Sequence, residues 1–410
     1  MSHYQNKGLL IIGGGILQQA TFDLCKKLSI NTFLVDGDVN CYSKKYADYF
    51  IHIDIRDIDL MLGKAKDLKQ ENLIHGVFTQ GTDVEHIVSY LARELNFHGM
   101  NYDAAMNCNN KLLCRKLIFD NKIDETPYFF ASSKNELKKI LKTLYDDFFP
   151  CFIKPVNNSA SRGVKRAINS DELIEFFDDA SKNNYNENTV LVEKEIIGNE
   201  ISVDSVVING ILYPCGISDR SFLNKHKYAV QTGSVTPSSL SPFIQTKVYE
   251  LMQDAASVLK IDNGAFKGDL VVKENNDIGV IEFAGRTSGG FDSQYRKPLS
   301  FGIDIIKTVL DLSLGFEVDF RDLIPKWSKW SSTFSVLTSS GKILKIKGFD
   351  ECLQIKGVYK GFMTLDEGDT VNEMVDCAQR FNYFICFGDS LNELREIEQK
   401  ISDTLNIEII

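Results

Sequence analysis

The stretch GDLVVKENNDIGVIEF, residues 268–283, contains two apolar runs separated by a polar turn. This pattern predicts two antiparallel strands joined as a hairpin. A symmetric turn centred between Asn275 and Asn276 places Asp269 directly opposite Glu282. Facing residues of such a pair hold their Cβ atoms about 4.5–5.5 Å apart, and two unit charges at about 5 Å repel by roughly 3 kcal/mol at an effective dielectric of about 20. The two carboxylates therefore need compensation.

Three arrangements compensate such a pair: a divalent cation held by both carboxylates, a proton shared between them, or full exposure to water. Mg²⁺ binds through one or two carboxylates together with phosphate oxygens, which suits this pair. Arg286 follows Glu282 by four residues, and a guanidinium beside a metal site clamps phosphate or carboxylate oxygens. Ser288, Gly289 and Gly290 then offer backbone N–H groups with little side-chain obstruction.

The composition is that of a globular protein of several domains, with 410 residues, 43% of them hydrophobic and 25% charged. A net charge of −10 argues against nucleic acid or anionic membranes as main partners. The nine cysteines form no CxxC pair, so neither a zinc site nor a disulfide framework is indicated. Residues 7–17 imitate a short signal sequence but lack a small-residue cleavage site. We expect a cytoplasmic protein that binds neither nucleic acid nor membranes.

The alternation of apolar and polar segments predicts three parts. Residues 9–38 read as strand, glycine turn, helix and second strand, and residues 75–96 repeat the strand and helix, which predicts a Rossmann-like parallel α/β domain over residues 1–104. Strands and amphipathic helices follow, and the chain closes with a small α+β region. We expect helices over residues 110–122, ending near Asn121, and over 136–149, with Leu144 and Tyr145 on the apolar face, and also over 246–260 and 391–405.

A nucleotide bound at the hairpin needs lysines and a loop that covers phosphates. Lys154 ends a short strand, which aims its ammonium group out of the sheet, although a solvated surface lysine is the commoner case. In the loop that follows, Ser159, Ser161 and Gly163 can fold over phosphates. The loop is not of the Walker type, and a plain turn is the alternative.

A base and a ribose need further polar groups, and residues 190–200 supply them. Glu193 ends an apolar strand and can accept from an exocyclic amine, while the backbone from Lys194 to Ile196 faces a base edge. Glu200 can hold ribose hydroxyl groups. Two ordinary surface glutamates flanking a loop are the alternative.

These stretches, in this order, resemble the ATP-grasp superfamily, which includes biotin carboxylase, the purine-pathway carboxylases, D-alanine–D-alanine ligase and the L-amino acid ligases. The likeness covers nearly the whole chain, and its specificity lies in the joint order of the motifs. It implies a two-lobed ATP-grasp domain over residues 105–318, with a flap subdomain at about 115–192, and a C-terminal α+β domain over 319–410. Related enzymes of this layout are often dimers, so a homodimer is expected.

The resemblance also implies roles for the residues. It implies catalytic roles for Arg286, which steadies an acyl phosphate, and Lys154; ATP contacts for Lys111, Lys154, Ser159, Ser161, Gly163, Glu193, Lys194, Ile196 and Glu200; and magnesium ligation by Asp269 and Glu282. Many relatives carry Asn two residues after the second metal carboxylate, where this chain has Ala284. A second Mg²⁺, or Mn²⁺ in its place, therefore has one protein ligand fewer.

Residues 218–240 are similar to the substrate-facing segment of the amino acid ligases. We expect Arg220 and His226 there to contact substrate or phosphate, the alternative being that either is a surface residue. Together with Arg286, Ser288, Gly289 and Gly290 they form the expected substrate site.

The glycine turn near the N-terminus allows a different function. Gly13 and Gly15 begin a GxGxxG pattern, but Gln18 stands at the third glycine position. Asp36 lies at the ribose-binding spacing of dinucleotide enzymes, so a hydride-transfer enzyme is an alternative. In ATP-grasp enzymes the resembling domain lines the acceptor site, where residues 79–83 either contribute or form a plain strand-end loop.

The resemblance implies an ATP-dependent carboxylate–amine ligase that forms an amide through an acyl phosphate and releases ADP and phosphate. The alternatives are an ATP-grasp carboxylase acting through carboxyphosphate, an ATP-grasp phosphotransferase, and a nucleotide-binding regulatory protein without turnover. The sequence does not identify the two small-molecule substrates.

Overall fold

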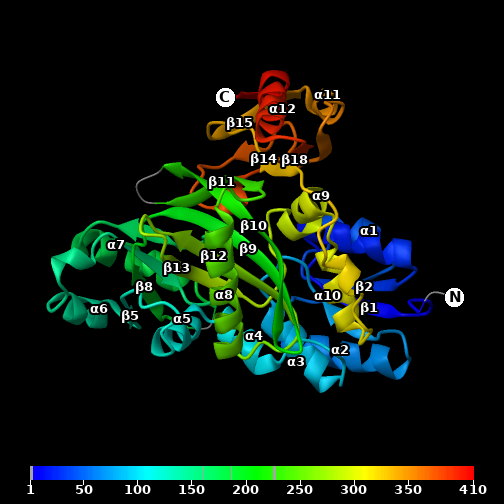
Figure 1. The fold of residues 1–410 in the computed structure, drawn as a ribbon, viewed down its shortest axis with the longest axis horizontal. Helices are drawn as coiled ribbons and strands as arrows, with labels where there is room; N and C mark the ends of the chain where they lie inside the picture. Colours follow the sequence, from blue (N-terminus) through cyan, green and yellow to red (C-terminus); the bar gives the residue numbers. More distant parts are fainter. Residues whose placement is uncertain (1–2, 159, 186, 225–227) are drawn as a thin grey trace.

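The computed structural model describes residues 3–158, 160–185, 187–224 and 228–410, so the expected site residues Ser159 and His226 lie outside the described residues. The strands form four sheets, with four, eight, three and four strands. Figure 1 shows the N-terminal sheet on one side, the segment carrying α6 and α7 on the opposite side, and the C-terminal segment above the central sheet. The predicted mixed α/β fold class is confirmed.

The N-terminal sheet is parallel throughout, in the order β3-β2-β1-β4. Its strands are β1 (Gly8–Ile12), β2 (Asn31–Asp36), β3 (Tyr49–His52) and β4 (Gly76–Phe78). The helices of this region are α1 (Gln19–Leu28), α2 (Ile58–Gln70), α3 (Glu85–Glu94) and α4 (Tyr102–Asn109). All five residues of β1 are buried, as expected for a parallel strand covered on both faces. The glycine turn after β1 therefore lies at the carboxyl edge of the sheet, where such folds bind ligands.

The second four-stranded sheet has the order β5-β8-β6-β7. Its strands are β5 (Tyr128–Ala131), β6 (Cys151–Pro155), β7 (Lys165–Ala167) and β8 (Val190–Lys194), and the nearby helices are α5 (Lys111–Asp120), α6 (Lys134–Leu141) and α7 (Ser170–Lys182). The expected helix over 136–149 ends at Leu141, because the chain turns into a short 3₁₀ segment over Asp146–Phe148. Tyr145 is 82% exposed, so its prediction as part of the apolar face is wrong.

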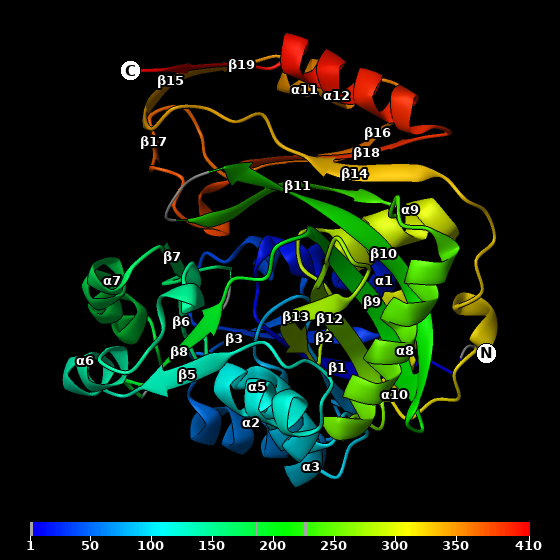
Figure 2. The ribbon, with the colours of Figure 1, turned by 60° about the vertical axis from the view of Figure 1, so that its left-hand side comes forward.

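The central sheet has eight strands in the order β13-β12-β9-β10-β11-β14-β18-β16. They are β9 (Asn199–Ile208), β10 (Ile211–Asn224), β11 (Ala229–Thr236), β12 (Gly264–Val272), β13 (Ile278–Ala284), β14 (Trp330–Phe334), β16 (Val358–Met363) and β18 (Asn382–Gly388). Helix α8 (Pro242–Val258) covers part of it, and Met252 packs with Phe266 and Phe283 in one buried cluster. The long strands β9 and β10 run behind α8 in Figure 2.

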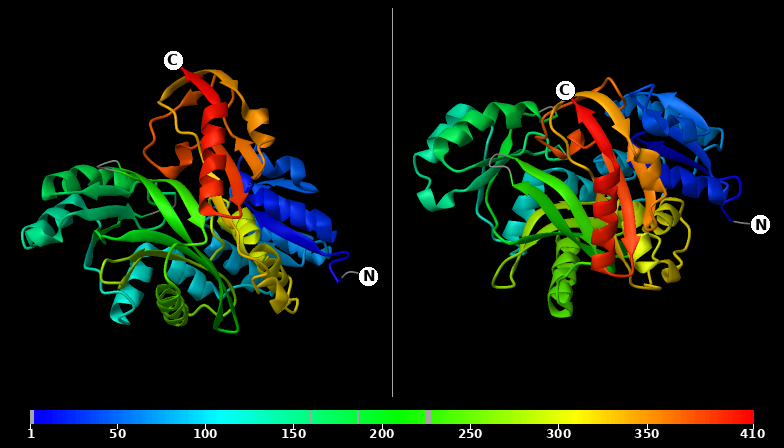
Figure 3. Two further views of the ribbon diagram at one scale, coloured as in Figure 1. Left: turned by 45° about the horizontal axis from the view of Figure 1, so that its top comes forward. Right: turned by 90° about the horizontal axis from the view of Figure 1, so that it is seen from above.

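The C-terminal segment is joined to the rest through this sheet, since β14 pairs with β11 across the expected boundary between residues 318 and 319. The remaining strands, β15 (Gly341–Lys347), β17 (Thr370–Val371) and β19 (Asn406–Ile409), form the three-stranded sheet, and the helices are α11 (Phe349–Leu353) and α12 (Leu391–Thr404). Figure 3 shows α12 over the strands of this segment.

Two helices link the central and N-terminal regions, α9 (Lys297–Phe301) and α10 (Ile305–Ser313). Ile306 and Leu310 of α10 pack in one cluster with Leu9 and Ile11 of β1. The N-terminal sheet is thereby fixed beside the central one, and the division into residues 1–104, 105–318 and 319–410 remains a prediction. No helix in the described ranges is long and apolar enough to cross a membrane.

Candidate functional site

The hairpin of β12 and β13 places Asp269 directly opposite Glu282, which confirms the predicted pairing. The turn is centred on Asn275, however, and not between Asn275 and Asn276, because Leu270 pairs with Val280 and Val272 with Ile278. Ile281 is an extra residue that shifts the register by one. Such a bulge re-aims the local backbone. The carbonyl oxygen of Ile281 accepts from Lys154 Nζ at 3.4 Å, so the bulge connects the hairpin to strand β6.

Cations of the protein surround the carboxylate pair. Lys267 Nζ donates to Asp269 Oδ2 at 2.6 Å, Arg220 Nη1 lies 3.4 Å from the same oxygen, and Lys111 Nζ lies 3.5 Å from Glu282 Oε1. Asp269 is 8% exposed, so full exposure to water does not explain the pair. Burial alone raises the pKa of Asp269, but Arg220 and Lys267 lower it to about 2, which excludes a shared proton at neutral pH.

The donor set of this hairpin fits Mg²⁺. Asp269 Oδ1 is buried and has no hydrogen-bond partner in the part of the chain that the structure describes. No group of three or more His, Cys, Asp or Glu side chains that could hold a metal occurs among the described residues. Two carboxylates with an open oxygen match an ion that completes its shell with water and phosphate oxygens. Ala284, which is buried, adds no ligand for a second ion.

A first cavity of about 160 Å³ opens on one side of the pair. Its apolar walls come from four different segments of the chain, Phe152, Ile196, Phe222 and Val280. Its charged lining includes the predicted ATP residues Lys111, Lys154, Glu193, Lys194 and Glu200, together with Arg115, Arg220, Asp269 and Glu282. An apolar slot that leads to clustered cations is the arrangement that a nucleotide needs.

A buried ionic network forms the floor of the first cavity. Lys154 and Glu193 form an ion pair, and so do Arg115 and Glu193. Arg115 Nη1 also donates to Asp124 Oδ2 at 2.6 Å. Burial alone raises the pKa of Glu193, but Arg115 and Lys154 lower it below its ordinary value, so Glu193 remains ionised. Lys154 is 7% exposed, so the alternative of a solvated surface lysine is excluded.

The expected adenine and ribose residues are brought to the same wall, with partners of their own. Both carboxylate oxygens of Glu193 are engaged by protein cations, one by each. Glu200 Oε2 lies 3.4 Å from Arg220 Nη1, and burial raises the pKa of Glu200 although Arg220 lowers it. The backbone N–H of Lys194 donates to Pro127 O at 2.9 Å, which fixes the segment that leads to Ile196.

Within the expected flap subdomain, the loop that is expected to cover phosphates follows strand β6 and contacts distant parts of the chain. Ala160 and Ser161 both adopt positive φ, 56° and 61°, and Ser161 lines the first cavity. Gly163 has a φ of 73°, and a Cβ there lies 2.7 Å from Asn183 Cβ, so only glycine fits. The backbone N–H of Cys377 donates to Ala160 O at 3.2 Å, so the flap touches the C-terminal segment.

A second cavity of about 320 Å³ opens on the other side of the carboxylate pair. Its lining includes the expected residues Arg220, Arg286, Ser288, Gly289 and Gly290, with Leu17, Asp83, Lys267, Arg296, Arg380 and Tyr383 from all three parts of the chain. Five residues line both cavities, Ala160, Ser161, Arg220, Asp269 and Glu282. The predicted metal pair therefore lies where the two cavities meet.

Arg286 is held at the wall of the second cavity by the N-terminal region. Its Nε donates to Asp83 Oδ1 at 2.6 Å, and its Nη1 donates to Thr287 O at 3.0 Å. Burial alone lowers the pKa of Arg286, but Asp83, Glu85 and Glu282 raise it above its ordinary value. The guanidinium therefore keeps its charge beside the metal pair.

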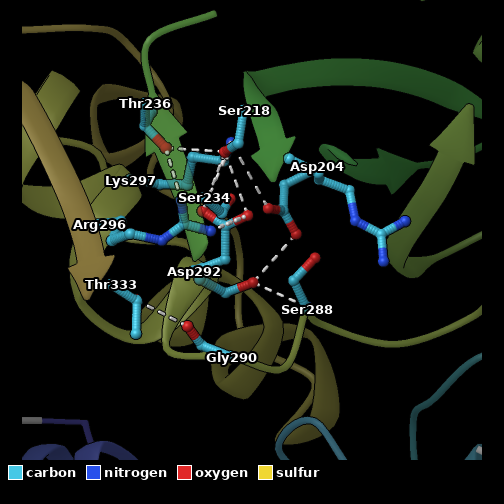
Figure 4. A network of polar contacts seen from close by, with 12 residues as sticks. Asp204, Ser218, Ser234, Thr236, Ser288, Gly290, Asp292, Arg296, Lys297 and Thr333 are labelled. Atoms are coloured by element: carbon cyan, nitrogen blue, oxygen red, sulfur yellow. Dashed lines mark hydrogen bonds and ion pairs between the residues drawn. The ribbon is translucent and has the colours of Figure 1, made fainter. Parts of the chain in front are cut away.

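Hydrogen bonds to two neighbouring segments fix the loop over residues 288–290 (Figure 4). The backbone N–H of Ser288 donates to Ser293 Oγ at 2.8 Å, and Gly290 O accepts from Thr333 Oγ1 at 2.9 Å. Ser288 N–H therefore has an internal partner. Gly290 has a φ of 61°, and a Cβ on Gly81, whose φ is 62°, would lie 3.3 Å from Gly289 Cα.

The N-terminal glycine turn is filled by the protein itself. Gln18 is fully buried, and its Nε2 donates to Ile12 O at 3.2 Å. Asp36 Oδ2 accepts from Gly14 N at 2.5 Å, and a Cβ on Gly14 lies 2.4 Å from Cys41 Sγ. The carboxylate of Asp36, which would bind the ribose of a dinucleotide, is thus bound to the glycine turn instead. This favours the ATP-grasp interpretation over a hydride-transfer enzyme.

Several site residues were missed by sequence reasoning. Lys267 precedes Asp269 by two residues on the same strand, so strand alternation alone places both on one face. Arg115, Arg296 and Arg380 carry no comparable local signal, because each reaches its cavity only through long-range packing.

Comparisons with known proteins agree with this geometry. Residues 147–294 match the family described as ATP-grasp domain, and residues 333–409 match L-amino acid ligase C-terminal domain 2. An uncharacterized protein y4rH of Sinorhizobium fredii is 22% identical over 391 residues, covering 93% of this chain and 78% of that protein. The chain spans about half the length of the formate-dependent phosphoribosylglycinamide formyltransferase and D-alanine–D-alanine ligase that it also matches.

Solved structures share the whole architecture. The L-amino acid ligase from Bacillus licheniformis is 19% identical, with a TM-score of 0.83 over 99% of each chain. The biotin carboxylase domain of the 2-oxoglutarate carboxylase from Hydrogenobacter thermophilus, a dimer in complex with MgADP and bicarbonate, is 17% identical, with a TM-score of 0.76 over 98% of this chain and 91% of that one. The chain therefore contains an ATP-grasp domain and a region that matches the C-terminal domain 2 of L-amino acid ligases, and the ligases among its matches share this fold.

Proposed function

We propose that the protein joins a carboxylate to an amine through an acyl phosphate and releases ADP and phosphate. The observation that carries this proposal is the position of Asp269 and Glu282, which line both cavities. A triphosphate that enters from the first cavity presents its terminal phosphoryl group to the second at this point. The C-terminal match to L-amino acid ligases favours an amide product.

In this proposal the first cavity binds ATP. The adenine lies between the apolar walls and meets the backbone of Lys194 to Ile196, and Glu200 with Arg220 faces the ribose. Glu193 serves mainly to hold Lys154 and Arg115, since both of its oxygens are engaged. Lys111 and Lys154 face the phosphates, and Ser161 with Gly163 covers them as part of the flap.

The metal site supports the same proposal. Asp269 and Glu282 hold Mg²⁺, or Mn²⁺ in its place, and the ion supplies charge neutralisation at the phosphate oxygens. Once ATP is bound, Lys267 and Arg220 keep Asp269 ionised and oriented. One ion is well provided with protein ligands, and a second depends more on phosphate and water because Ala284 offers none.

The second cavity holds the reacting carboxylate. Its oxygen attacks the γ-phosphorus, the bond to the β,γ-bridging oxygen breaks and ADP leaves. Lys154 and Arg286 neutralise the developing charge, because phosphoryl transfer depends chiefly on positioning and electrostatics. The amine then attacks the acyl carbon and phosphate leaves. Arg286 and the N–H groups of Gly289 and Gly290 stabilise the oxyanion. The contact between Ala160 and Cys377 supports a closed flap that excludes water from the acyl phosphate.

The test is release of ADP and phosphate from MgATP with panels of carboxylates and amines, with and without bicarbonate, followed by mass spectrometry of the product. An amide that appears in step with ADP supports the ligase. Bicarbonate dependence identifies a carboxylase, a phosphorylated product without an amide identifies a phosphotransferase, and nucleotide binding without release identifies a regulatory protein. The homodimer is tested by light scattering on the same preparation.

A further inference from the structure

Three arginines gather at one corner of the second cavity. Arg220, Arg296 and Arg380 all line this cavity, and we call them the arginine corner. They come from β10, from the π-helical turn Asp292–Arg296 and from the segment before β18. Arg220 is paired with Glu200 and Asp269, so the other two decide what the corner binds.

Arg296 is rigidly held and yet has an open donor (Figure 4). It is 2% exposed, its Nη2 lies 2.8 Å from Asp292 Oδ2, and its Nη1 donates to Ser234 Oγ at 2.6 Å. Its Nε is buried and lacks a hydrogen-bond partner among the residues that the structure describes. A buried N–H without a partner is costly, so this donor points to a ligand.

The carboxylate beside Arg296 is shared with a buried lysine. Asp292 also lies 3.5 Å from Nζ of Lys297, a fully buried lysine whose other carboxylate, Asp204, is 3.8 Å away. Burial lowers the pKa of Arg296, and the neighbouring charges of Arg380 and Arg220 lower it further although Asp292 and Asp204 raise it. Asp292 and Asp204 therefore balance Arg296 and Lys297, and the unbalanced positive charge of the corner is that of Arg380.

Arg380 adds a second open donor from the C-terminal segment. Its Nε is buried without a hydrogen-bond partner, and no carboxylate within the described ranges forms an ion pair with it. Its guanidinium carbon lies 5.3 Å from the ring centroid of Tyr383, a contact that orients the group without neutralising it. Two fixed guanidinium groups that face one cavity match the planar oxygens of a carboxylate or phosphate.

We propose that the arginine corner binds a second anionic group on the carboxylate substrate, so that this substrate is a small dicarboxylate or a phosphorylated carboxylate. The inference rests on the proposed function, because it takes Arg286 and the metal pair as the place where the other carboxylate reacts. One cavity contains both places, so a single small molecule spans them. The corner then selects the substrate by charge.

The experiment compares matched carboxylate donors: L-aspartate with L-asparagine, L-glutamate with L-glutamine, and O-phospho-L-serine with L-serine. Hydroxylamine serves as the common amine, and the hydroxamate formed is measured. For the wild type we expect kcat/KM to be about 10- to 100-fold higher for the anionic member of at least one pair. The first two pairs test a carboxylate, and the third tests a phosphate.

The variant Arg380→Gln is expected to reduce that preference about tenfold, while kcat/KM for the neutral donor and KM for ATP change less than twofold. Arg296→Lys keeps the charge but loses the Nε donor, and it should reduce the preference less. Arg321→Gln is the matched control, because its side chain is 84% exposed and pairs only with Asp319 among the described residues. Equal losses for both members of a pair overturn the proposal, as does an increase in the KM for ATP.

Two further measurements separate this proposal from the ligase proposal. Binding of the same pairs is measured by calorimetry with Mg²⁺ and a non-hydrolysable ATP analogue. Tighter binding of anionic donors that Arg380→Gln removes supports the corner even if no hydroxamate forms, in which case only the ligase proposal fails. If no anionic donor binds more tightly, the corner proposal is wrong. The proposal is also wrong if Arg380→Gln instead changes the preference between L-alanine and L-alaninamide as the amine substrate, because the corner would then bind the amine.

Discussion

Beneath the first cavity, Arg115 joins Asp124 and Glu193, and Glu193 joins Lys154, whereas beneath the second cavity Asp292 is shared by Arg296 and Lys297. The two networks are similarly buried but differ in how completely they are satisfied. In the described part of the chain no buried side-chain polar atom of the first network lacks a hydrogen-bond partner, while Arg296 Nε of the second network does.

This difference indicates a separate role for each network. A buried network with all partners in place fixes neighbouring groups, and its loss is costly for stability. A network with open donors next to a cavity is completed by a ligand, so its loss affects selectivity more than folding. In the proposed function the first network holds Lys154 in place for the nucleotide, and in the further inference the second network presents Arg296 to the substrate.

The largest expected effect is at the junction that both cavities share. Glu282→Gln removes one metal carboxylate, and we expect kcat to fall by roughly 100- to 1000-fold or more while the far-ultraviolet circular dichroism is unchanged. Steady-state phosphate release measures this. Glu274→Gln, on the exposed turn of the same hairpin, is the control and should retain full activity. A fully active Glu282→Gln variant would contradict the metal assignment.

The next largest effect distinguishes the two networks by stability. Arg115→Met leaves Asp124 buried without its cation and Glu193 with Lys154 alone, and we expect the free energy of unfolding to fall by about 3–5 kcal/mol. Arg380→Gln removes a group with no ion pair among the described residues and should change it by less than about 1 kcal/mol. Urea unfolding followed by fluorescence measures both. Equal losses would show that the networks do not differ in this way.

A third prediction concerns Glu85, which is 4% exposed beside Arg286 and Asp83. Burial, followed by Asp83, raises the pKa of Glu85 to about 7, although Arg286 lowers it. In the unfolded chain this group ionises near pH 4.3, so its contribution is intact below that pH and is lost as the pH rises through about 7. Glu85→Gln should therefore raise the melting temperature at pH 8 and change it little at pH 4.

The pH series for Glu85→Gln has an internal check. Glu94→Gln, at a partly exposed position on the same helix, should give the pH dependence of the wild type. If Glu85→Gln stabilises the protein equally at pH 4 and pH 8, the raised pKa is not the cause. If the melting temperature of Glu85→Gln has the same pH dependence as that of the wild type, Glu85 is exposed to water behind Arg286.

The smallest effect is expected at the anchor of the loop 288–290. Thr333→Val removes the hydroxyl that donates to Gly290 O, and we expect a loss of about 1 kcal/mol in stability. Because the loop carries the proposed oxyanion donors, kcat should fall a few-fold with KM for ATP unchanged. Initial-rate kinetics measure this. An increase in KM for ATP would place the loop on the nucleotide side instead.

Local features of the fold were predictable from the sequence. The parallel N-terminal sheet followed from buried apolar runs alternating with helical spacing, and the pairing of Asp269 with Glu282 followed from the polar turn between two strands. The bulge at Ile281 did not follow, because one extra residue in a strand leaves no trace in an apolar run. The end of α6 at Leu141 was missed for a similar reason, since the apolar spacing continues beyond the last helical turn.

Much of the candidate site was also visible in the sequence, but its partners were not. Three charged residues lie at strand ends next to apolar runs, Lys154, Glu193 and Arg286. A charge at such a position indicates a functional site. The engagement of both oxygens of Glu193 depends on Arg115, which lies on a helix 78 positions earlier in the chain. A pattern in one segment does not indicate which distant charge opposes it.

By itself the sequence determined that two strands flank the polar turn at residues 273–277 and that Asp269 faces Glu282, because strand alternation and turn geometry act over a few residues. Only the tertiary structure decided that this pair lies between two cavities and that Arg296 and Arg380 meet at one of them. The physical reason is that burial and charge pairing depend on distances between segments, and packing brings together residues that are far apart in the chain.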